Sequence, residues 1–204
     1  MNEDDTRLCW VDLETTGLHE DCEILEVGMV VTDRDLEPVA AFHAFIHHDL
    51  STLLMSDGAW QMHRNNGLWD ELVRRRDERW MWECSVTFGG RSIPGMRLAR
   101  GSYDRGFLTQ TIDDFVKEHA LGCPLAGSTV SFDRRHMTRY WPRAVSMLHY
   151  RNVDVSSIRE LLRRFRPDVA LRPKSDKHRS LDDLDVSIDV ARVFRAFVVP
   201  PEAP

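Results

Sequence analysis

The sequence has 204 residues, 42% hydrophobic and 29% charged, the composition of an ordinary globular protein with one sizeable core. No apolar run reaches the ~20 residues that a membrane span needs, and the acidic, polar start is unlike a signal peptide, so we expect a cytoplasmic protein that binds no membrane. The net charge of -6 disfavours tracking along nucleic acids, whose phosphates attract lysine and arginine. A short phosphodiester substrate held through metal ions stays compatible with this charge.

Three extended stretches open the chain. Residues 7–14, 24–32 and 38–47 are apolar and rich in β-branched side chains, and short acidic or glycine-containing joints separate them, so we expect a three-stranded meander. Residues 50–79 have a helical pattern in two pieces, with breaks near Asp57-Gly58 and at residues 65–67. Residues 80–106 combine glycines, a proline and two tryptophans without a helical stripe, which predicts a loop or small hairpin inserted in the domain.

Helices and strands alternate in the second half. A helix is expected over residues 107–119, a short buried strand over 123–130, and a helix over 132–140 that Pro142 ends. A strand over 150–155 and a capping box at Ser157-x-x-Glu160, which opens a helix over 158–165, come next. Apolar residues from Leu181 to Val198 then recur at three- and four-residue steps, which predicts a last helix, and we expect a flexible tail over residues 199–204.

This order of elements defines the fold class. Strands that first form a meander and then alternate with helices predict an α/β protein, with a mixed five-stranded sheet flanked by helices. We expect a single domain over residues 1–204, because the sequence contains no linker, repeat or low-complexity tract.

Two carboxylates stand two residues apart in the first strand. Period-two alternation puts Asp12 and Glu14 on one face and Val11 and Leu13 on the other. Two carboxylates this close repel each other, and a hard cation such as Mg²⁺ or Mn²⁺ bound between them offsets this repulsion. An edge strand with an exposed polar face is the ordinary alternative, so the pair alone does not decide between them.

The residues that follow extend the pattern. Residues 10–18, Trp-Val-Asp-Leu-Glu-Thr-Thr-Gly-Leu, resemble the first motif of the DEDD 3′-to-5′ exonucleases. Asp133, in Gly127-Ser-Thr-Val-Ser-Phe-Asp133, is similar to the second motif and lies at a predicted strand-to-helix junction. The segment from Lys177 to Asp183 resembles the third motif of the histidine subtype, H-x-x-x-x-D. Five residues of helix rotate His178 about 140° out of line with Asp183, so we expect His178 on a loop and Asp183 inside the helix.

Within this superfamily the chain is most similar to oligoribonuclease, over residues 7–70 and 107–197. The resemblance implies an RNase H-like fold, two divalent cations (Mg²⁺ or Mn²⁺) on Asp12, Glu14, Asp133 and Asp183, and His178 as the general base. It implies base contacts from Leu18 and Trp60, and contacts to the substrate phosphate from Thr129, Arg151, Ser156 and Ser157. It also implies a homodimer, with Tyr150 and its neighbours near the interface and contributing to the partner's substrate site.

The expected reaction is 3′-to-5′ hydrolysis of short single-stranded RNA, down to dinucleotides, to nucleoside 5′-monophosphates. One alternative is an exonuclease of the same superfamily that trims longer single strands of RNA or DNA. A second alternative, from another class, is a nucleic-acid-binding module that keeps the fold without turnover. The chain departs from the family where Ser128 replaces the usual asparagine, where Phe132 replaces the usual glutamine, and in the insertion at 80–106.

Overall fold

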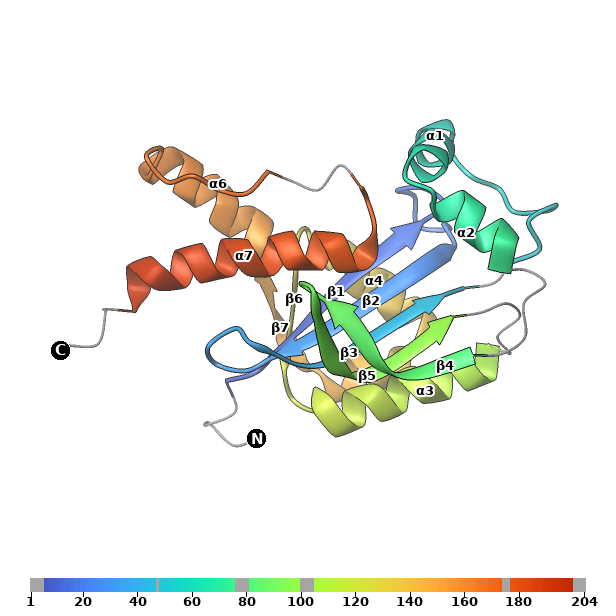
Figure 1. Ribbon diagram of the computed structural model, residues 1–204, viewed down its shortest axis with the longest axis horizontal. Coiled ribbons are helices and arrows are strands. Elements are labelled where there is room, and N and C mark those ends of the chain that lie inside the picture. Colours follow the sequence, from blue (N-terminus) through green and yellow to red (C-terminus); the bar gives the residue numbers. More distant parts are fainter. Residues whose placement is uncertain (1–5, 47, 76–80, 100–104, 174–176, 200–204) are drawn as a thin grey trace.

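A seven-stranded mixed sheet lies at the centre of the protein (Figure 1), seen in a computed structural model that describes residues 6–46, 48–75, 81–99, 105–173 and 177–199. The strands are β1 (Leu8–Thr15), β2 (Ile24–Thr32), β3 (Pro38–Phe45), β4 (Met81–Phe88), β5 (Arg91–Ala99), β6 (Pro124–Gly127) and β7 (His149–Asp154). Their spatial order is β4-β5-β3-β2-β1-β6-β7. The helices are α1 (Asp57–Asn65), α2 (Leu68–Arg75), α3 (Arg105–His119), α4 (Ser131–Tyr140), α5 (Pro142–Met147), α6 (Val155–Phe165) and α7 (Ser180–Val198).

The predicted meander is confirmed. β1 pairs antiparallel with β2, and β2 pairs antiparallel with β3, while β6 and β7 continue the sheet in parallel on the other side of β1. The predicted count of five strands is wrong. The segment taken as an insertion forms the hairpin β4–β5, and β5 pairs in parallel with β3, so the hairpin extends the sheet by two strands. Its apolar side chains Val86, Phe88 and Ile93 are buried, which explains why this glycine-rich segment is ordered against the sheet.

Three helix boundaries differ from the sequence prediction. Helix α1 begins at Asp57, because the Ser56 side chain caps it by accepting from the Ala59 amide. Helix α4 ends at Tyr140, as predicted, but Pro142 begins a further helix, α5, that the prediction lacks; proline suits this first position because the first-turn amides have no partner within the helix. The capping box is also misplaced: α6 begins at Val155, and Asp154 is its N-cap. Part of the predicted insertion (residues 80 and 100–104), residue 47 and tail residues 200–204 lie outside the described ranges.

Two apolar clusters cover the two faces of the sheet. Cys9, Val11 and Leu13 of β1 pack on one face with residues of α3, α4 and α5. On the opposite face Trp10 of β1 packs with Leu184 and Ile188 of α7, which crosses the sheet (Figure 1). The alternation predicted for β1 therefore holds, and even-numbered residues of this strand point toward α7.

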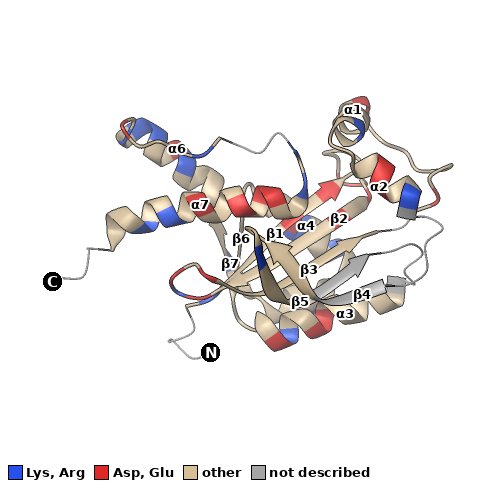
Figure 2. Cartoon of the chain, viewed as in Figure 1, with Lys and Arg blue, Asp and Glu red and all other residues tan. Residues whose placement is uncertain are grey.

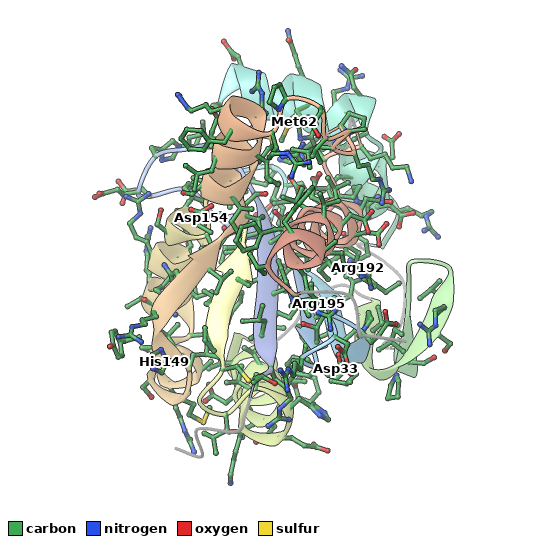
Figure 3. The ribbon with its side chains drawn as sticks, turned by 90° about the vertical axis from the view of Figure 1, so that its left-hand side faces the viewer. Asp33, Met62, His149, Asp154, Arg192 and Arg195 are labelled. Carbon is green, nitrogen blue, oxygen red and sulfur yellow. The ribbon has the colours of Figure 1, made fainter. Side chains whose placement is uncertain are left out.

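Charge is distributed unevenly over the helices. Acidic residues mark the first half of α7 and basic residues lie along α6 (Figure 2). Figure 3 shows β7 running from His149 at one end of the sheet to Asp154 at the other, with Met62 of α1 beyond the Asp154 end. None of the helices in the described ranges is both long and apolar enough to cross a membrane.

Candidate active site

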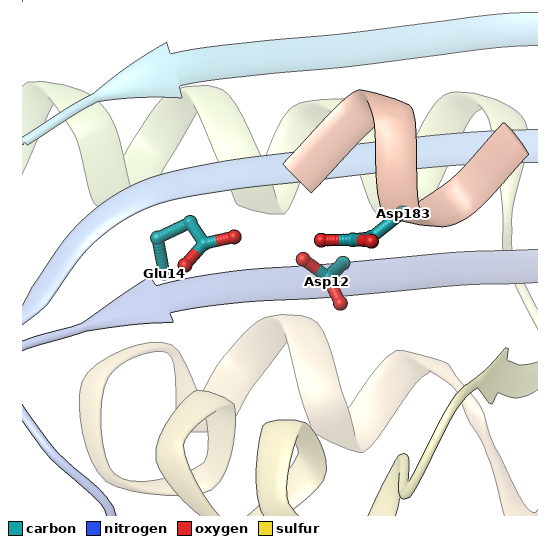
Figure 4. A group of neighbouring side chains, drawn as sticks. All are labelled: Asp12, Glu14 and Asp183. Atoms are coloured by element: carbon teal, nitrogen blue, oxygen red, sulfur yellow. The ribbon is translucent and has the colours of Figure 1, made fainter. Parts of the chain in front are cut away.

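Strand β1 carries the first two carboxylates of the site. Asp12 and Glu14 follow Trp10 on the α7 face of the sheet, where alternation places them on one side of the strand (Figure 4). Asp12 lies opposite Gly28 of β2, and Glu14 lies opposite Glu26. Because Gly28 has no side chain, the first residue of α7 lies directly on the sheet; a Cβ at Gly28 would be 2.8 Å from the Ser180 Oγ.

Helix α7 brings the third carboxylate. Asp183 lies in its first turn, with its amide donating to the Arg179 carbonyl at 2.9 Å. One ligand oxygen each from Asp12, Glu14 and Asp183 lie within 4.8 Å of one another, and the three side chains converge in Figure 4. Residues about 170 positions apart in the sequence thus meet at one point above β1.

Asp133 approaches from the other face. It lies in the first turn of α4, is 4% exposed, and its Oδ1 accepts a hydrogen bond from the Leu13 amide at 3.1 Å. This amide is available because β6 pairs with β1 at Cys9 and Trp10 only, and the chain then turns into α4. Asp133 lines the same cleft as the other three acids, so the structure brings all four predicted carboxylates to one end of β1.

The carboxylates raise one another's pKa values. Burial raises the pKa of Asp12, and the charges of Asp133, Glu14 and Asp183 raise it further. Burial together with Glu26 and Asp183 raises the pKa of Glu14 to about 9, and burial raises that of Asp133 to about 8 despite the hydrogen bond from Leu13. The ionised form of these four carboxylates is therefore unfavourable in the metal-free protein, and a bound cation would stabilise it.

The donor set fits hard divalent cations. All the converging ligands are carboxylate oxygens, which suit Mg²⁺ and Mn²⁺ and not the nitrogen and sulfur preference of Zn²⁺. The distances among Asp12, Glu14 and Asp183 are short enough for one ion to touch all three, and Asp133 adds a fourth carboxylate to the same cleft. The residues present therefore match the metal ions that the sequence resemblance implies.

His178 lies on the loop before α7, as the sequence spacing predicts. Its backbone has φ of +43°, a left-handed conformation that is uncommon for a residue other than glycine. The Asn66 side chain holds this conformation by donating to the His178 carbonyl at 2.7 Å. The imidazole is exposed and lines the cleft with the four acids.

The cleft has a volume of about 790 Å³ and two walls. The loop from Thr15 to Leu18 and the helix α1 form one wall, and the segment from Ser128 to Arg135 forms the other. Leu18 is 87% exposed, and Thr129 holds a left-handed φ of +56° with its amide donating to Asp154 at 3.0 Å. Both of these predicted substrate contacts line the cleft.

The other predicted substrate contacts do not line this cleft. The Trp60 ring packs edge-on against the Trp69 ring, with 4.6 Å between the ring centroids. Ala59 and Met62 form the cleft wall beside it. Tyr150 and Arg151 project from β7, and Tyr150 is 74% exposed. Ser156 and Ser157 lie in the first turn of α6, where the Ser156 hydroxyl donates to Asp154 at 2.5 Å. Asp154 is thus the residue that caps α6, and the Ser156 hydroxyl is bonded to this cap.

A buried cluster beside the site was missed by the sequence analysis. Glu26 is 1% exposed, its Oε1 is 2.6 Å from the His43 Nε2, and both of its oxygens accept hydrogen bonds from Arg179. The sequence feature that could have revealed this cluster is Glu26 itself, a single acid inside the apolar stretch 24–32.

His63 is a second buried residue that the sequence analysis missed. Its Nε2 donates to the Thr15 carbonyl at 2.8 Å, and its Nδ1 lies 4.0 Å from Glu14.

Known proteins resemble the chain over nearly its whole length. No protein-family model matches the sequence. Oligoribonuclease of Neisseria meningitidis serogroup B is 32% identical over 197 residues, covering 95% of this chain and 92% of that protein. Oligoribonuclease of Pseudoalteromonas translucida is 33% identical over 199 residues, covering 96% of this chain and 97% of its own length.

Solved structures share the fold. A zinc-bound complex of E. coli exonuclease I with single-stranded DNA has a TM-score of 0.63 at 15% identity, covering 95% of this chain. Exonuclease I of Methylocaldum szegediense has a TM-score of 0.59 at 17% identity, covering 93% of this chain. This chain spans about two fifths of these exonuclease I chains (41% and 40%), so the likeness shows an α/β, RNase H-like fold. With relatives above 30% identity over almost their full length, the chain belongs to the oligoribonuclease family.

Proposed function

We propose that this protein hydrolyses short single-stranded RNA from the 3′ end, down to dinucleotides, and releases nucleoside 5′-monophosphates. The observation that carries the proposal is the meeting of Asp12, Glu14 and Asp183 within 4.8 Å, in a cleft that Asp133 and His178 also line. Family membership supports it, because the relatives are named oligoribonucleases.

The four carboxylates would hold two divalent cations, Mg²⁺ or Mn²⁺. When bound, such ions supply Lewis acidity, which lowers the pKa of an attacking water and offsets negative charge at the phosphorus. Each carboxylate has its own support in the fold. Asp12 and Glu14 are fixed on a strand, Asp133 by the Leu13 amide, and Asp183 by the first turn of α7.

His178 would act as the general base. Its imidazole is exposed in the cleft, where it can take a proton from water. The Asn66 hydrogen bond and the following helix fix its backbone at the cleft that Asp183 also lines.

We assign substrate contacts to both walls of the cleft. Leu18 would lie against the bases, and Thr129 would contact phosphate. For Trp60, Arg151, Ser156 and Ser157 the support is the family resemblance, since they lie outside the cleft of this chain. Tyr150 and Arg151 project from β7 into solvent, which is compatible with a homodimer in which they reach the partner's substrate. We also expect the protein to act in the cytoplasm.

RNA of graded length tests the proposal. The wild-type protein is incubated in Mn²⁺ or Mg²⁺ with 5′-labelled RNA of about two, seven and twenty nucleotides, beside Asp133→Ala and His178→Ala. Faster turnover of the dinucleotide, lost in both variants, supports the proposal. Equal or faster degradation of the longest strand would instead indicate an exonuclease for long strands. Binding without metal-dependent products would indicate a non-catalytic module.

A further inference from the structure

Asn66 joins helix α1, which lines the cleft, to helix α2. Its backbone N–H donates to the Met62 carbonyl at 3.0 Å and so ends α1. Its side-chain Oδ1 accepts a hydrogen bond from the Leu68 amide at 2.9 Å and so caps the start of α2. Because a backbone N–H can only donate, the atom that faces Leu68 is the oxygen, and the amide nitrogen of Asn66 is the atom that donates to the His178 carbonyl at 2.7 Å.

Helix α1 is anchored to the end of β1, the strand that carries Glu14. The buried His63 donates from Nε2 to the Thr15 carbonyl at 2.8 Å, and the Ser56 amide, just before the helix, donates to the Thr16 carbonyl at 2.9 Å. These two bonds hold both ends of α1 against the chain that follows Glu14. The turn at Asn66 therefore has a defined place relative to the carboxylates.

His178 needs support from outside its own loop. Its φ of +43° is a conformation that a side chain with a Cβ disfavours, and its imidazole is exposed. The next residue, Arg179, is held to β2 through Glu26, but these bonds come from the arginine side chain. Asn66 instead bonds the His178 carbonyl itself, so it acts on the peptide group that sets the direction of the imidazole.

We propose that Asn66 is a positioning residue of the reaction, which holds His178 in its left-handed conformation and so directs the imidazole into the cleft. The proposal rests on the proposed function, in which His178 is the general base. A base displaced by about 1 Å can lose a hundredfold in rate, so the support of its backbone matters for turnover. Asn66 does not line the cleft, and its effect on the reaction therefore passes through His178.

Two substitutions separate this role from helix capping. Aspartate and serine cap helices about as well as asparagine does, so Asn66→Asp and Asn66→Ser keep the cap of α2, but neither side chain has an amide N–H for the His178 carbonyl. We expect both variants to lower kcat for an RNA dinucleotide roughly ten- to a hundredfold, with KM and the melting temperature near the wild-type values. Asn66→Ser adds no charge, so its loss of kcat cannot come from a new carboxylate near His178.

The neighbouring residue supplies the matched control. Asn65 is exposed and does not line the cleft, so Asn65→Asp makes the same change of charge one position earlier and should keep wild-type kcat. A double-mutant cycle then tests the route of the effect. If Asn66 acts through His178, Asn66→Asp has no further effect on kcat once His178→Ala is present. A variant that is merely less well folded lowers kcat in both backgrounds.

A second measurement needs no turnover. The ¹³Cα and carbonyl chemical shifts of His178 in the metal-free protein report its backbone conformation. We expect left-handed values in the wild type and in Asn65→Asp, and a change toward extended values in both Asn66 variants.

The outcomes separate the role of Asn66 from the reaction. Wild-type kcat or unchanged His178 shifts in both Asn66 variants, or an equal loss of kcat in the His178→Ala background, overturns the proposal even if the wild type degrades RNA. His178 shifts that change only in the Asn66 variants, in a protein that releases no nucleotide in Mn²⁺, support the Asn66 contact and refute the proposed reaction.

Discussion

The guanidinium of Arg179 donates two hydrogen bonds to the buried carboxylate of Glu26, from Nε to Oε2 at 3.0 Å and from Nη2 to Oε1 at 3.2 Å. Arg179 directly follows His178 and is the N-cap residue of α7, so this pair fixes the segment that carries both His178 and Asp183 to β2. Burial alone would raise the pKa of Glu26, but His43 and Arg179 lower it to about 2, so Glu26 is ionised at neutral pH.

Arg179→Met should destabilise the protein strongly. Removing Arg179 leaves the buried Glu26 carboxylate with the His43 contact but without its two guanidinium hydrogen bonds, which costs about 3 kcal/mol. Arg172→Met is the control, because Arg172 also pairs with acids of α7 but at the surface, where the loss is below about 1 kcal/mol. Urea unfolding at pH 7 measures both, and equal stabilities of the two variants would show that the Glu26 pair does not anchor α7.

Gly28→Ala should displace the start of α7. The new methyl group would lie 2.8 Å from the Ser180 Oγ and 3.2 Å from the Ser180 carbonyl carbon, so the start of the helix must move away from β2 and take Asp183 with it. We expect a loss of about 1–3 kcal/mol and a marked fall in activity. Gly58→Ala, with nothing within 4 Å of the added atom, is the matched control for stability and should unfold as the wild type does. Wild-type turnover by Gly28→Ala would contradict this account of the packing.

The stability of the metal-free protein should fall as the pH rises. Glu14 and Asp133 have folded-state pKa values of about 9 and about 8, above their ordinary values, so the folded protein keeps protons that the unfolded chain releases. The free energy of unfolding therefore decreases from about pH 4.5 to about pH 9. Glu26 has the opposite sign, and its contribution is lost only as the pH falls from about 4.5 towards 2.

Thermal unfolding in EDTA at pH 5 to 9 measures this slope. Mn²⁺ should raise the melting temperature more at pH 8 than at pH 5, because a bound cation requires ionised carboxylates. Asp12→Asn should flatten the slope and reduce the effect of Mn²⁺, whereas Glu118→Gln, at an exposed acid, should change neither. A flat melting temperature between pH 5 and 9 in the metal-free wild type would argue against a strained acid cluster.

His178→Ala should lower kcat by roughly 10²- to 10⁴-fold, the usual contribution of a positioned general base. KM for the RNA and the stabilisation by Mn²⁺ should stay near wild-type values, since His178 is not among the converging metal ligands. His119→Ala, a histidine at the end of α3, serves as the control. A variant at His178 that loses Mn²⁺ stabilisation together with kcat would mean that the residue supports the metal centre.

Local sequence patterns predicted much of the fold. Alternation in β1 placed Asp12 and Glu14 correctly, and the five-residue spacing placed His178 before the helix of Asp183. The pairing of strands that lie far apart in the sequence was harder to predict. The hairpin β4–β5 joins the sheet through β3, a parallel contact that nothing in residues 80–106 encodes locally.

Parts of the site could not be predicted for the same reason. The link from Arg179 to Glu26 joins residues 153 positions apart, and neither residue has a motif of its own. Trp60 has a contact that the sequence did not predict: its ring packs on Trp69 of α2, although the two residues carry no common motif. Capping by Asp154 likewise engages the Ser156 hydroxyl, which the sequence assigns to phosphate as well.

Release of nucleoside 5′-monophosphate from an RNA dinucleotide is the most direct test of the carboxylate centre. The wild type and the single variants Asp12→Asn, Glu14→Gln, Asp133→Asn and Asp183→Asn are compared in Mn²⁺ and in EDTA. We predict metal-dependent product from the wild type, and a loss of about 10³-fold in each variant, as expected when several kcal/mol of metal-based stabilisation are removed. Near-wild-type turnover by any of the four variants, or turnover that persists in EDTA, would contradict a reaction driven by cations on these acids.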